Sequence, residues 1–144
     1  MGLGKTVQAI ALLLDRSKLG PALVVAPTSV GDNWARELTR FAPSLRPVLL
    51  RETDREKKTL QGLGPRDILV ASYDLARIDV DELVHVKWAT LVLDEAQRVK
   101  NASTKTSQAL AQLQAGWRMA LTGTPIENHL GELWSIMSFL NPGL

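Results

Sequence analysis

Five short apolar runs set the fold that this sequence can adopt. They occupy residues 22–26, 48–50, 68–71, 89–93 and 118–121, with helical or polar patterns between them. Short runs that stay apolar, instead of alternating with polar residues, are typical of strands buried on both faces. Strands that alternate with helices pair in parallel. The sequence therefore predicts an α/β fold, a parallel sheet with helices on both faces.

Helical patterns fill most of the intervals between these runs. Helices are expected over residues 5–19, 32–41 and 51–58, around 75–78, up to about 113, and over 133–140. Gly20-Pro21 ends the first of them, because proline cannot continue a helix. Several large side chains follow the apolar faces and are expected in the core: Trp34, Leu38, Phe41, Trp88, Trp117 and Trp134.

Composition limits the class of protein. The 144 residues are 45% apolar, enough for one domain with a substantial core. No apolar run approaches the ~20 residues of a membrane span, so the chain is expected to be soluble and intracellular. It has no cysteine, and His85 and His129 lack a second ligand at metal-binding spacing. The net charge of +2 is too small to indicate nucleic-acid binding by itself.

The start of the chain carries a phosphate-binding pattern. Gly2-Leu3-Gly4-Lys5-Thr6 matches the second half of a P-loop, in which backbone N–H groups cradle phosphates and threonine ligates Mg²⁺. A helix beginning at Lys5 would direct its positive end at the same anion. A complete P-loop follows a strand, so the fold is expected to lack its first strand. The alternative is a glycine turn before an ordinary amphipathic helix.

Polar side chains follow four of the five predicted strands. They are Thr28-Ser29, Ser72-Tyr73, Asp94-Glu95 and Thr122-Gly123-Thr124. In open parallel sheets, ligands bind beyond the carboxyl ends of the strands. These four clusters are therefore expected to gather at one edge of the sheet and to form a site there.

Asp94 and Glu95 carry the most specific chemistry. An aspartate after a buried strand beside a P-loop can hold Mg²⁺, and a neighbouring glutamate can accept a proton from the water that attacks the γ-phosphate. Thr6 and Asp94 would then be the protein's metal ligands. The alternative is that Asp94 caps a helix N-terminus, which also suits an acidic pair.

Taken together, the motifs resemble a known family, the Swi/Snf-type ATPases. These are helicase-like DNA translocases of superfamily two, and the ending of this chain looks like their bacterial branch. The motifs appear in the family's order as Gly-Leu-Gly-Lys-Thr-Val-Gln, Ala-Pro-Thr-Ser, Ala-Ser-Tyr, Leu-Asp-Glu-Ala-Gln and Leu-Thr-Gly-Thr-Pro-Ile-Glu-Asn. The resemblance covers nearly the whole chain. It implies that residues 1–144 are one N-terminal RecA-like lobe that binds ATP and Mg²⁺.

The resemblance also implies a role for each motif. Nucleotide binding would fall to Gly2, Leu3, Gly4, Lys5, Thr6 and Asp94, and catalysis to Lys5 and Glu95. Coupling of nucleotide state to DNA would involve Gln97, Thr122, Gly123 and Thr124. Contacts to the backbone of double-stranded DNA would come from Thr28, Ser29, Ser72, Tyr73, Lys100 and Asn101. Hydroxyl and N–H groups suit phosphates without reading bases, so binding without sequence specificity is expected.

Two departures from the family pattern affect the expected activity. Many relatives have histidine where this chain has Gln97, which can donate and accept hydrogen bonds but cannot carry a proton. Family members also have residues before the first motif and a second RecA-like lobe that brings an arginine finger, worth ~10³–10⁵ in rate. A lone first lobe is therefore expected to hydrolyse ATP poorly.

The prediction from sequence is thus the ATP-binding lobe of a DNA-dependent translocase that remodels bound protein, in the cytoplasm at the bacterial nucleoid. Two alternatives remain open. One is a truncated, non-catalytic lobe that binds nucleic acid or protein. The other is a P-loop switch or kinase, which the Thr-Gly-Thr-Pro and Ser-Tyr segments argue against.

Overall fold

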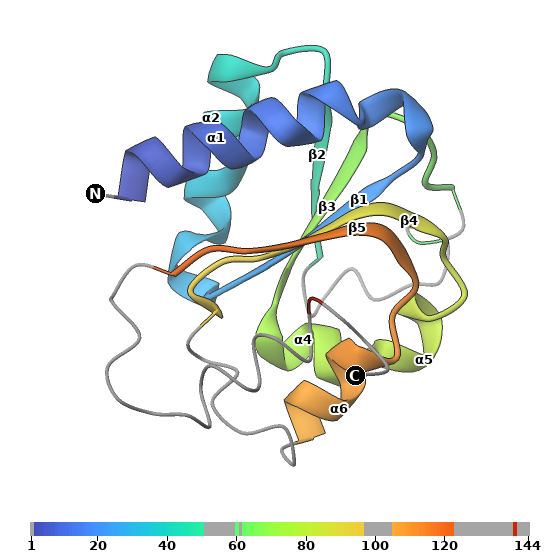
Figure 1. The fold of residues 1–144 in the computed structure, drawn as a ribbon. Helices are drawn as coiled ribbons and strands as arrows, with labels where there is room; N and C mark the ends of the chain where they lie inside the picture. Colours follow the sequence, from blue (N-terminus) through green and yellow to red (C-terminus); the bar gives the residue numbers. More distant parts are fainter. Residues whose placement is uncertain (1, 51–59, 61, 97–104, 123–139, 141–144) are drawn as a thin grey trace.

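A five-stranded parallel sheet forms the centre of the computed structural model, which describes residues 2–50, 60, 62–96, 105–122 and 140 (Figure 1). The strand order is β2-β3-β1-β4-β5, and every neighbouring pair is parallel. The strands are β1 (Ala22–Ala26), β2 (Arg46–Leu49), β3 (Asp67–Ser72), β4 (Trp88–Leu93) and β5 (Ala115–Ala120). Each predicted strand is present, and the predicted α/β class is confirmed.

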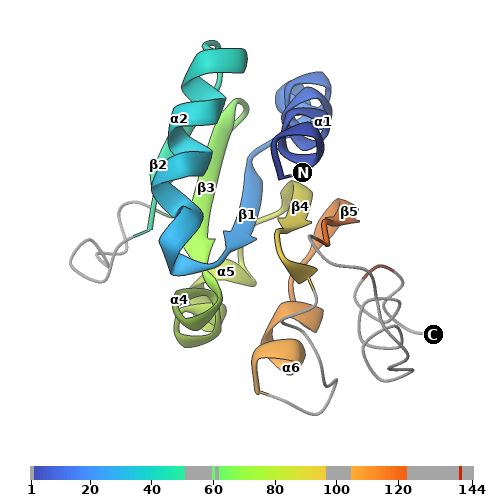
Figure 2. The same ribbon diagram turned by 90° about the vertical axis from the view of Figure 1, so that its left-hand side faces the viewer.

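Helices cover both faces of the sheet, as predicted. Figure 2 shows α1 (Gly2–Asp15) and α2 (Gly31–Phe41) on one face, and α4 (Tyr73–Ile78), α5 (Val80–Leu83) and α6 (Lys105–Ala111) on the other. Two short 3₁₀ turns, η1 (Ser17–Leu19) and η2 (Thr28–Val30), flank β1. The four-residue α5 was not predicted, because it is too short to show a helical period.

The sheet divides the core into two layers. Leu23 and Val25 of β1 belong to the layer under α4, α5 and α6, whereas Val24 belongs to the layer under α1 and α2. Strand side chains point alternately to the two faces, and here both faces are covered. This explains why the strands are apolar throughout and not only at every second residue.

Leu23→Ala tests how much this core contributes. Leu23 has no exposed surface in the central strand, so its truncation should lower the free energy of unfolding by about 2–5 kcal/mol. Leu19→Ala is the matched control, because Leu19 is 67% exposed and its loss should cost less than about 0.5 kcal/mol. Chemical denaturation of both variants measures the difference. Equal losses would contradict the assignment of Leu23 to the core.

Three local predictions were wrong. The first helix begins at Gly2 and not at Lys5, since Leu3 and Gly4 also adopt helical backbone. Phe41, the last residue of α2, is 42% exposed. Trp117 is 51% exposed on β5, the last strand in the described order, with the Arg16 guanidinium 5.6 Å from its ring. The helices expected over 51–58 and 133–139, with Trp134, lie outside the described residues.

Candidate nucleotide-binding site

The lysine of the phosphate motif lies at the carboxyl edge of the sheet. The N-terminal end of α1 is above the edge where β1, β4 and β5 end (Figure 1). Buried Ala9, Ile10 and Leu13 anchor the helix there. The exposed Lys5 donates a hydrogen bond from Nζ to the carbonyl oxygen of Thr122, just beyond β5. The Lys5 ammonium thus lies where the last strands end.

The earlier start of α1 changes the shape of the phosphate motif but leaves its donors in place. An α-helix leaves its first four N–H groups without a partner inside the helix. In α1 three of these groups belong to Gly2, Leu3 and Gly4, which are among the residues expected to cradle phosphate. The helix dipole also makes this end partly positive. A Cβ added at Gly4 would meet nothing within 4 Å, so the backbone there is open to a ligand.

Asp94 is fixed at the same edge by the backbone on both sides of it. Its N–H donates to the Val25 carbonyl oxygen at 2.8 Å, and Ala96 N–H donates to the Leu121 carbonyl oxygen at 2.7 Å. These bonds join the end of β4 to its two neighbours, β1 and β5. Since Leu121 precedes Thr122, the acidic pair and the Lys5 ammonium lie beside the same strand ends.

The Asp94 side chain is held by two donors. Its Oδ2 accepts a hydrogen bond from Trp34 Nε1 at 2.8 Å, and its Oδ1 accepts from the Glu95 N–H at 2.9 Å. The Tyr73 hydroxyl donates to the Asp94 carbonyl oxygen at 2.6 Å. The bond to Glu95 reaches the next residue and not the second or third residue of a helix, as an N-cap does. The second residue on, Ala96, donates to Leu121 instead, so no capping bond to Asp94 occurs within the part of the chain that the structure describes.

Glu95 has an unusual backbone conformation. Its φ of 52° lies in the left-handed region, which costs a residue with a Cβ roughly 1–2 kcal/mol. Such strain is retained mainly where the surrounding structure imposes it, often at functional sites. Here Asp94 and Ala96 are tied to β1 and β5, and the residue between them must make the turn. This conformation was not predictable, because glutamate gives no signal for it.

The oxygen ligands at this edge suit Mg²⁺ better than metals that need several protein ligands. The described residues contain no group of three or more His, Cys, Asp or Glu side chains that could hold a metal ion. Mg²⁺ needs no such group, because one or two carboxylates plus phosphate oxygens and water complete its shell. A carboxylate has about four lone-pair positions, and the two bonds to Asp94 leave room for such a ligand. Thr6, half-buried in α1, directly follows Lys5.

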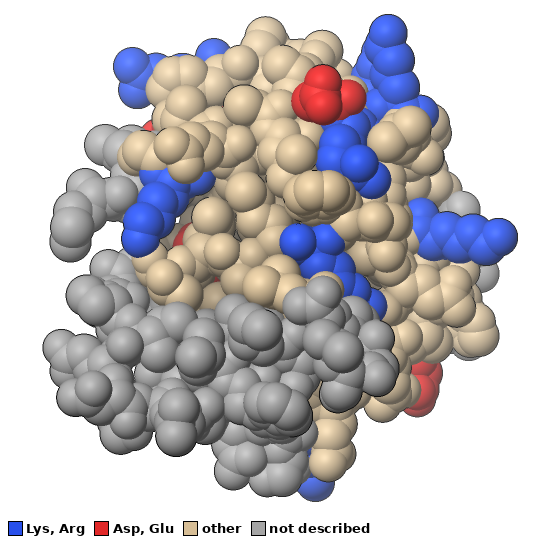
Figure 3. Space-filling model, in the orientation of Figure 1, with Lys and Arg blue, Asp and Glu red and all other residues tan. Residues whose placement is uncertain are grey.

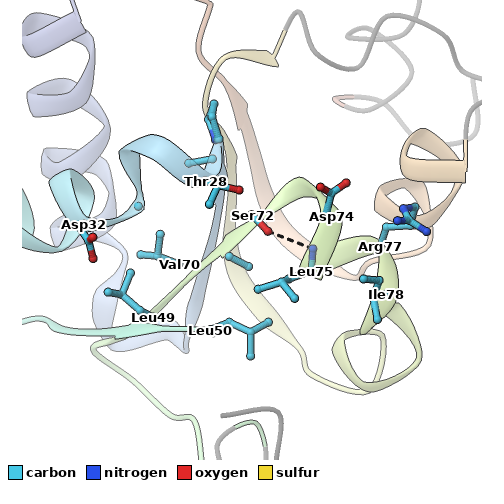
Figure 4. A pocket seen from close by; sticks show the side chains of 14 residues that line it. Thr28, Asp32, Leu49, Leu50, Val70, Ser72, Asp74, Leu75, Arg77 and Ile78 are labelled. Carbon is cyan, nitrogen blue, oxygen red and sulfur yellow. Dashed lines mark hydrogen bonds between the residues drawn. The ribbon is translucent and has the colours of Figure 1, made fainter. Parts of the chain in front are cut away.

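A separate pocket of about 680 Å³ opens beside the carboxyl ends of β1, β2 and β3 (Figure 4). Thr28 and Ser72 lie at its rim, above the apolar side chains of Leu49, Leu50 and Val70. Asp32, Asp74 and Arg77 also line it. Two carboxylates against one guanidinium make the pocket itself a poor anion site. Contact with phosphate is thus expected only at its hydroxyl-bearing rim.

The residues expected to contact DNA differ in how they are exposed. Thr28 and Ser29 are exposed, whereas Ser72 is half-buried and accepts a hydrogen bond from the Leu75 N–H at 3.1 Å. Ser72 therefore caps α4 and keeps its O–H as a donor. Tyr73 is only 9% exposed and its hydroxyl points inward to Asp94. Burial turns the Tyr73 phenol away from the surface, and the DNA contact expected at this residue stays a prediction.

Trp34 is the site residue that the sequence did not reveal. Its pattern on α2 indicated packing, and the ring is indeed only 1% exposed. A buried indole N–H needs an acceptor, and this was the available signal that Trp34 has a polar partner. The half-buried Thr122 lies at the end of β5. The remaining predicted residues are outside the described part of the chain: Gln97, Lys100, Asn101, Gly123 and Thr124.

The sheet and its covering helices place the chain in the RecA-like class of ATPase lobes. Residues 1–144 match the SNF2-related domain, and the chain belongs to that family. Among curated relatives, it is 46% identical over 149 residues to YwqA of Bacillus subtilis, which is named as an ATP-dependent helicase/translocase. It is 38% identical over 158 residues to the human chromatin-remodeling ATPase INO80. These matches cover 99% and 100% of this chain but only 16% and 10% of the two relatives.

Solved structures agree with the family. The SWI2/SNF2 ATPase core of Sulfolobus solfataricus, determined in complex with double-stranded DNA, is 45% identical and superposes with a TM-score of 0.85. A second solved structure, of the SWI2/SNF2 ATPase core domain from the same organism, is 47% identical and superposes with a TM-score of 0.84. The alignments cover 99% of this chain and 30% and 29% of those chains. The resemblance seen in the motifs and the RecA-like fold are thus confirmed.

Within the described residues, no helix is both long and apolar enough to span a membrane.

Proposed function

We propose that this chain is the N-terminal ATP-binding lobe of a DNA-dependent Swi/Snf-type translocase, with the nucleotide at the edge formed by Lys5 and Asp94. The observation that carries the proposal is the position of the Lys5 ammonium beside the strand ends that hold Asp94. An ATPase of this family needs a cation for the terminal phosphates and a carboxylate for the metal within one ligand's reach. Lys5 and Asp94 supply that pair.

Each residue would then have a distinct task. The N–H groups of Gly2, Leu3 and Gly4 would bind the phosphate oxygens, and Lys5 would exchange its bond to Thr122 for the terminal phosphate. Thr6 and Asp94 would hold Mg²⁺, which when bound supplies positive charge to the phosphate oxygens. Glu95, next to Asp94, would accept the proton of the attacking water.

The DNA contact would be made at the rim of the pocket. Thr28, Ser29 and the Ser72 hydroxyl offer donors to phosphate oxygens of one DNA strand, which gives no base specificity. The support is the solved relative described in complex with double-stranded DNA. On the face seen in Figure 3, the basic side chains of the described residues lie at separate places. A contact through hydroxyl and backbone groups does not require a broad basic patch.

The activity of the whole protein extends this proposal. We expect a second RecA-like lobe to complete the site with an arginine, and Gln97 with residues 122–124 to couple the nucleotide to DNA. Lys100 and Asn101 would add to the DNA surface, and the protein would track along DNA in the bacterial nucleoid and displace bound protein. The competing candidate is a non-catalytic binding lobe. DNA-stimulated ATP hydrolysis by the whole protein separates the two, because only a catalytic lobe supports it.

Thr28→Glu tests the DNA contact. Replacing the hydroxyl by a carboxylate removes a hydrogen bond to phosphate and adds repulsion, so double-stranded DNA should bind at least about tenfold more weakly. Thr39→Glu is the control, because Thr39 is also exposed but lies in the last turn of α2, away from the pocket rim. Fluorescence anisotropy with labelled duplex measures both. An equal loss in the two variants would mean that net charge alone, and not the rim, governs binding.

A further inference from the structure

Both segments proposed to face DNA reach the same aspartate through a single hydrogen bond each. The first segment, Thr28-Ser29, leads directly into α2, where Trp34 donates to Asp94 Oδ2 at 2.8 Å. The second, Ser72, caps α4, whose first residue Tyr73 donates to the Asp94 carbonyl oxygen at 2.6 Å. The two donors belong to helices that follow different strands, β1 and β3, and both bond to the residue proposed to bind Mg²⁺.

We infer that Trp34 and Tyr73 are positioning residues that connect DNA engagement to the metal-binding geometry of Asp94. This inference rests on the proposed function and assigns it a physical link within this lobe. The link does not involve β5, because α2 follows β1 and α4 follows β3, and both of these strands lie on the other side of β4 in the strand order.

Trp34 is well placed to orient the carboxylate. The ring is only 1% exposed and packs in the core layer with Leu38 and Val24. Its position therefore follows that of α2 as a rigid element. With Oδ2 on the indole N–H and Oδ1 on the Glu95 N–H, rotation of the carboxylate breaks at least one bond. Groups that orient a metal ligand in this way typically change metal affinity by 10–100-fold when removed.

The chain distances make the connection short. Only four residues separate Ser29 from Trp34, and η2 passes directly into α2 between them. Ser72 and Tyr73 are neighbours. If either rim segment shifts when DNA phosphates bind to it, the hydrogen-bond donor next to it, Trp34 or Tyr73, would move relative to Asp94. Because coupling free energies are reciprocal, Mg·ATP and DNA should each strengthen the binding of the other.

Trp34→Phe removes the indole N–H while keeping an aromatic ring in the core. In the full 144-residue chain, the Mg²⁺ concentration that half-saturates ATP binding should rise by about 10–100-fold. ATP affinity in EDTA should stay unchanged, because the phosphate cradle is untouched. The strengthening of Mg·ATP binding by duplex DNA should also be lost. Titration with a fluorescent ATP analogue, with and without duplex, measures all three quantities.

Trp88→Phe is the matched control. Trp88 is another buried tryptophan, 2% exposed, and its Nε1 donates to the Leu83 carbonyl oxygen at 3.1 Å, at the far end of β4. Its loss should cost similar stability but leave the Mg²⁺ requirement and the DNA effect intact. Tyr73→Phe, which removes only one hydroxyl, should shift both quantities in the same direction as Trp34→Phe. If circular dichroism shows that Trp34→Phe is unfolded, Tyr73→Phe takes its place as the test variant.

The outcomes separate the inference from the proposed function. Suppose that the wild-type chain binds Mg·ATP and DNA, and that the folded Trp34 and Tyr73 variants have the same Mg²⁺ requirement and the same response to DNA. The inference is then wrong and the proposed function stands. A shift in Trp88→Phe equal to that in Trp34→Phe would also overturn it, because general destabilisation would then be the cause. A wild-type chain that binds neither ligand overturns the proposed function and the inference with it.

Discussion

Glu95→Gln should lower DNA-stimulated ATP hydrolysis by about 10²–10⁴-fold, the range that general acid–base catalysis contributes. Glutamine has nearly the same shape as glutamate and can occupy the same strained backbone, but it cannot accept the proton of the attacking water. Affinity for Mg·ATP should stay close to the wild-type value, because Asp94 and Lys5 are unchanged. Steady-state hydrolysis by the whole protein and nucleotide titration of this chain measure the two effects.

Glu82→Gln provides the control for this substitution. Glu82 belongs to α5, on the face covered by α4, α5 and α6. Its replacement changes the charge in the same way, but α5 precedes β4 and is not at the carboxyl ends of the strands. It should leave hydrolysis near the wild-type rate. If Glu95→Gln bound Mg·ATP and hydrolysed it at the wild-type rate, another group would have to activate the water. If both variants lost activity equally, the loss would reflect net charge or folding.

The sheet was predictable because its signals are local. The run Ala22–Ala26 was expected as a strand and has those bounds in the structure, since every one of its residues is buried. The position of Asp94 and Thr122 at the carboxyl edge of the sheet also followed from the sequence. Parallel strands end at one edge, so residues that follow them meet there wherever each strand lies in the sheet.

What the sequence could not provide is the order of the strands and the partners of buried polar atoms. Trp117 was expected in the core, but β5 is the last strand of the described sheet and leaves the ring half exposed. Nothing in the residue pattern separates a central strand from the last one. Likewise, the helical pattern around Trp34 shows that the ring is buried, but not that its N–H meets Asp94.

Tyr73 illustrates the same limit at the functional site. The family motif includes both Ser72 and Tyr73, and the resemblance implied a DNA contact for each of them. The capped start of α4 instead turns consecutive residues in different directions, Ser72 toward the rim and Tyr73 toward the core. A motif thus identifies which residues matter, whereas the local geometry decides which partner each one contacts.

Lys5→Ala should weaken Mg·ATP binding by roughly 10–150-fold, because a hydrogen bond to a charged group contributes about 1.5–3 kcal/mol. Hydrolysis should fall at least as much, since charge on the terminal phosphate grows as the water attacks. The fold should be unaffected. Lys5 is exposed, and its contact with the Thr122 carbonyl oxygen can be replaced by water. Isothermal titration of Mg·ATP and thermal denaturation measure the two effects.

Lys18→Ala is the control that makes the result specific. Lys18 is also exposed, and its replacement removes the same charge. It lies in η1, near Arg46 at the start of β2 and Arg66 just before β3. Its loss should leave Mg·ATP affinity unchanged, because this is the amino edge of the sheet. An equal fall in Mg·ATP affinity in both variants would show that ATP is attracted by overall charge. The assignment of the nucleotide site to the edge beside Lys5 would then be wrong. Retained affinity in Lys5→Ala would move the nucleotide to another part of the chain.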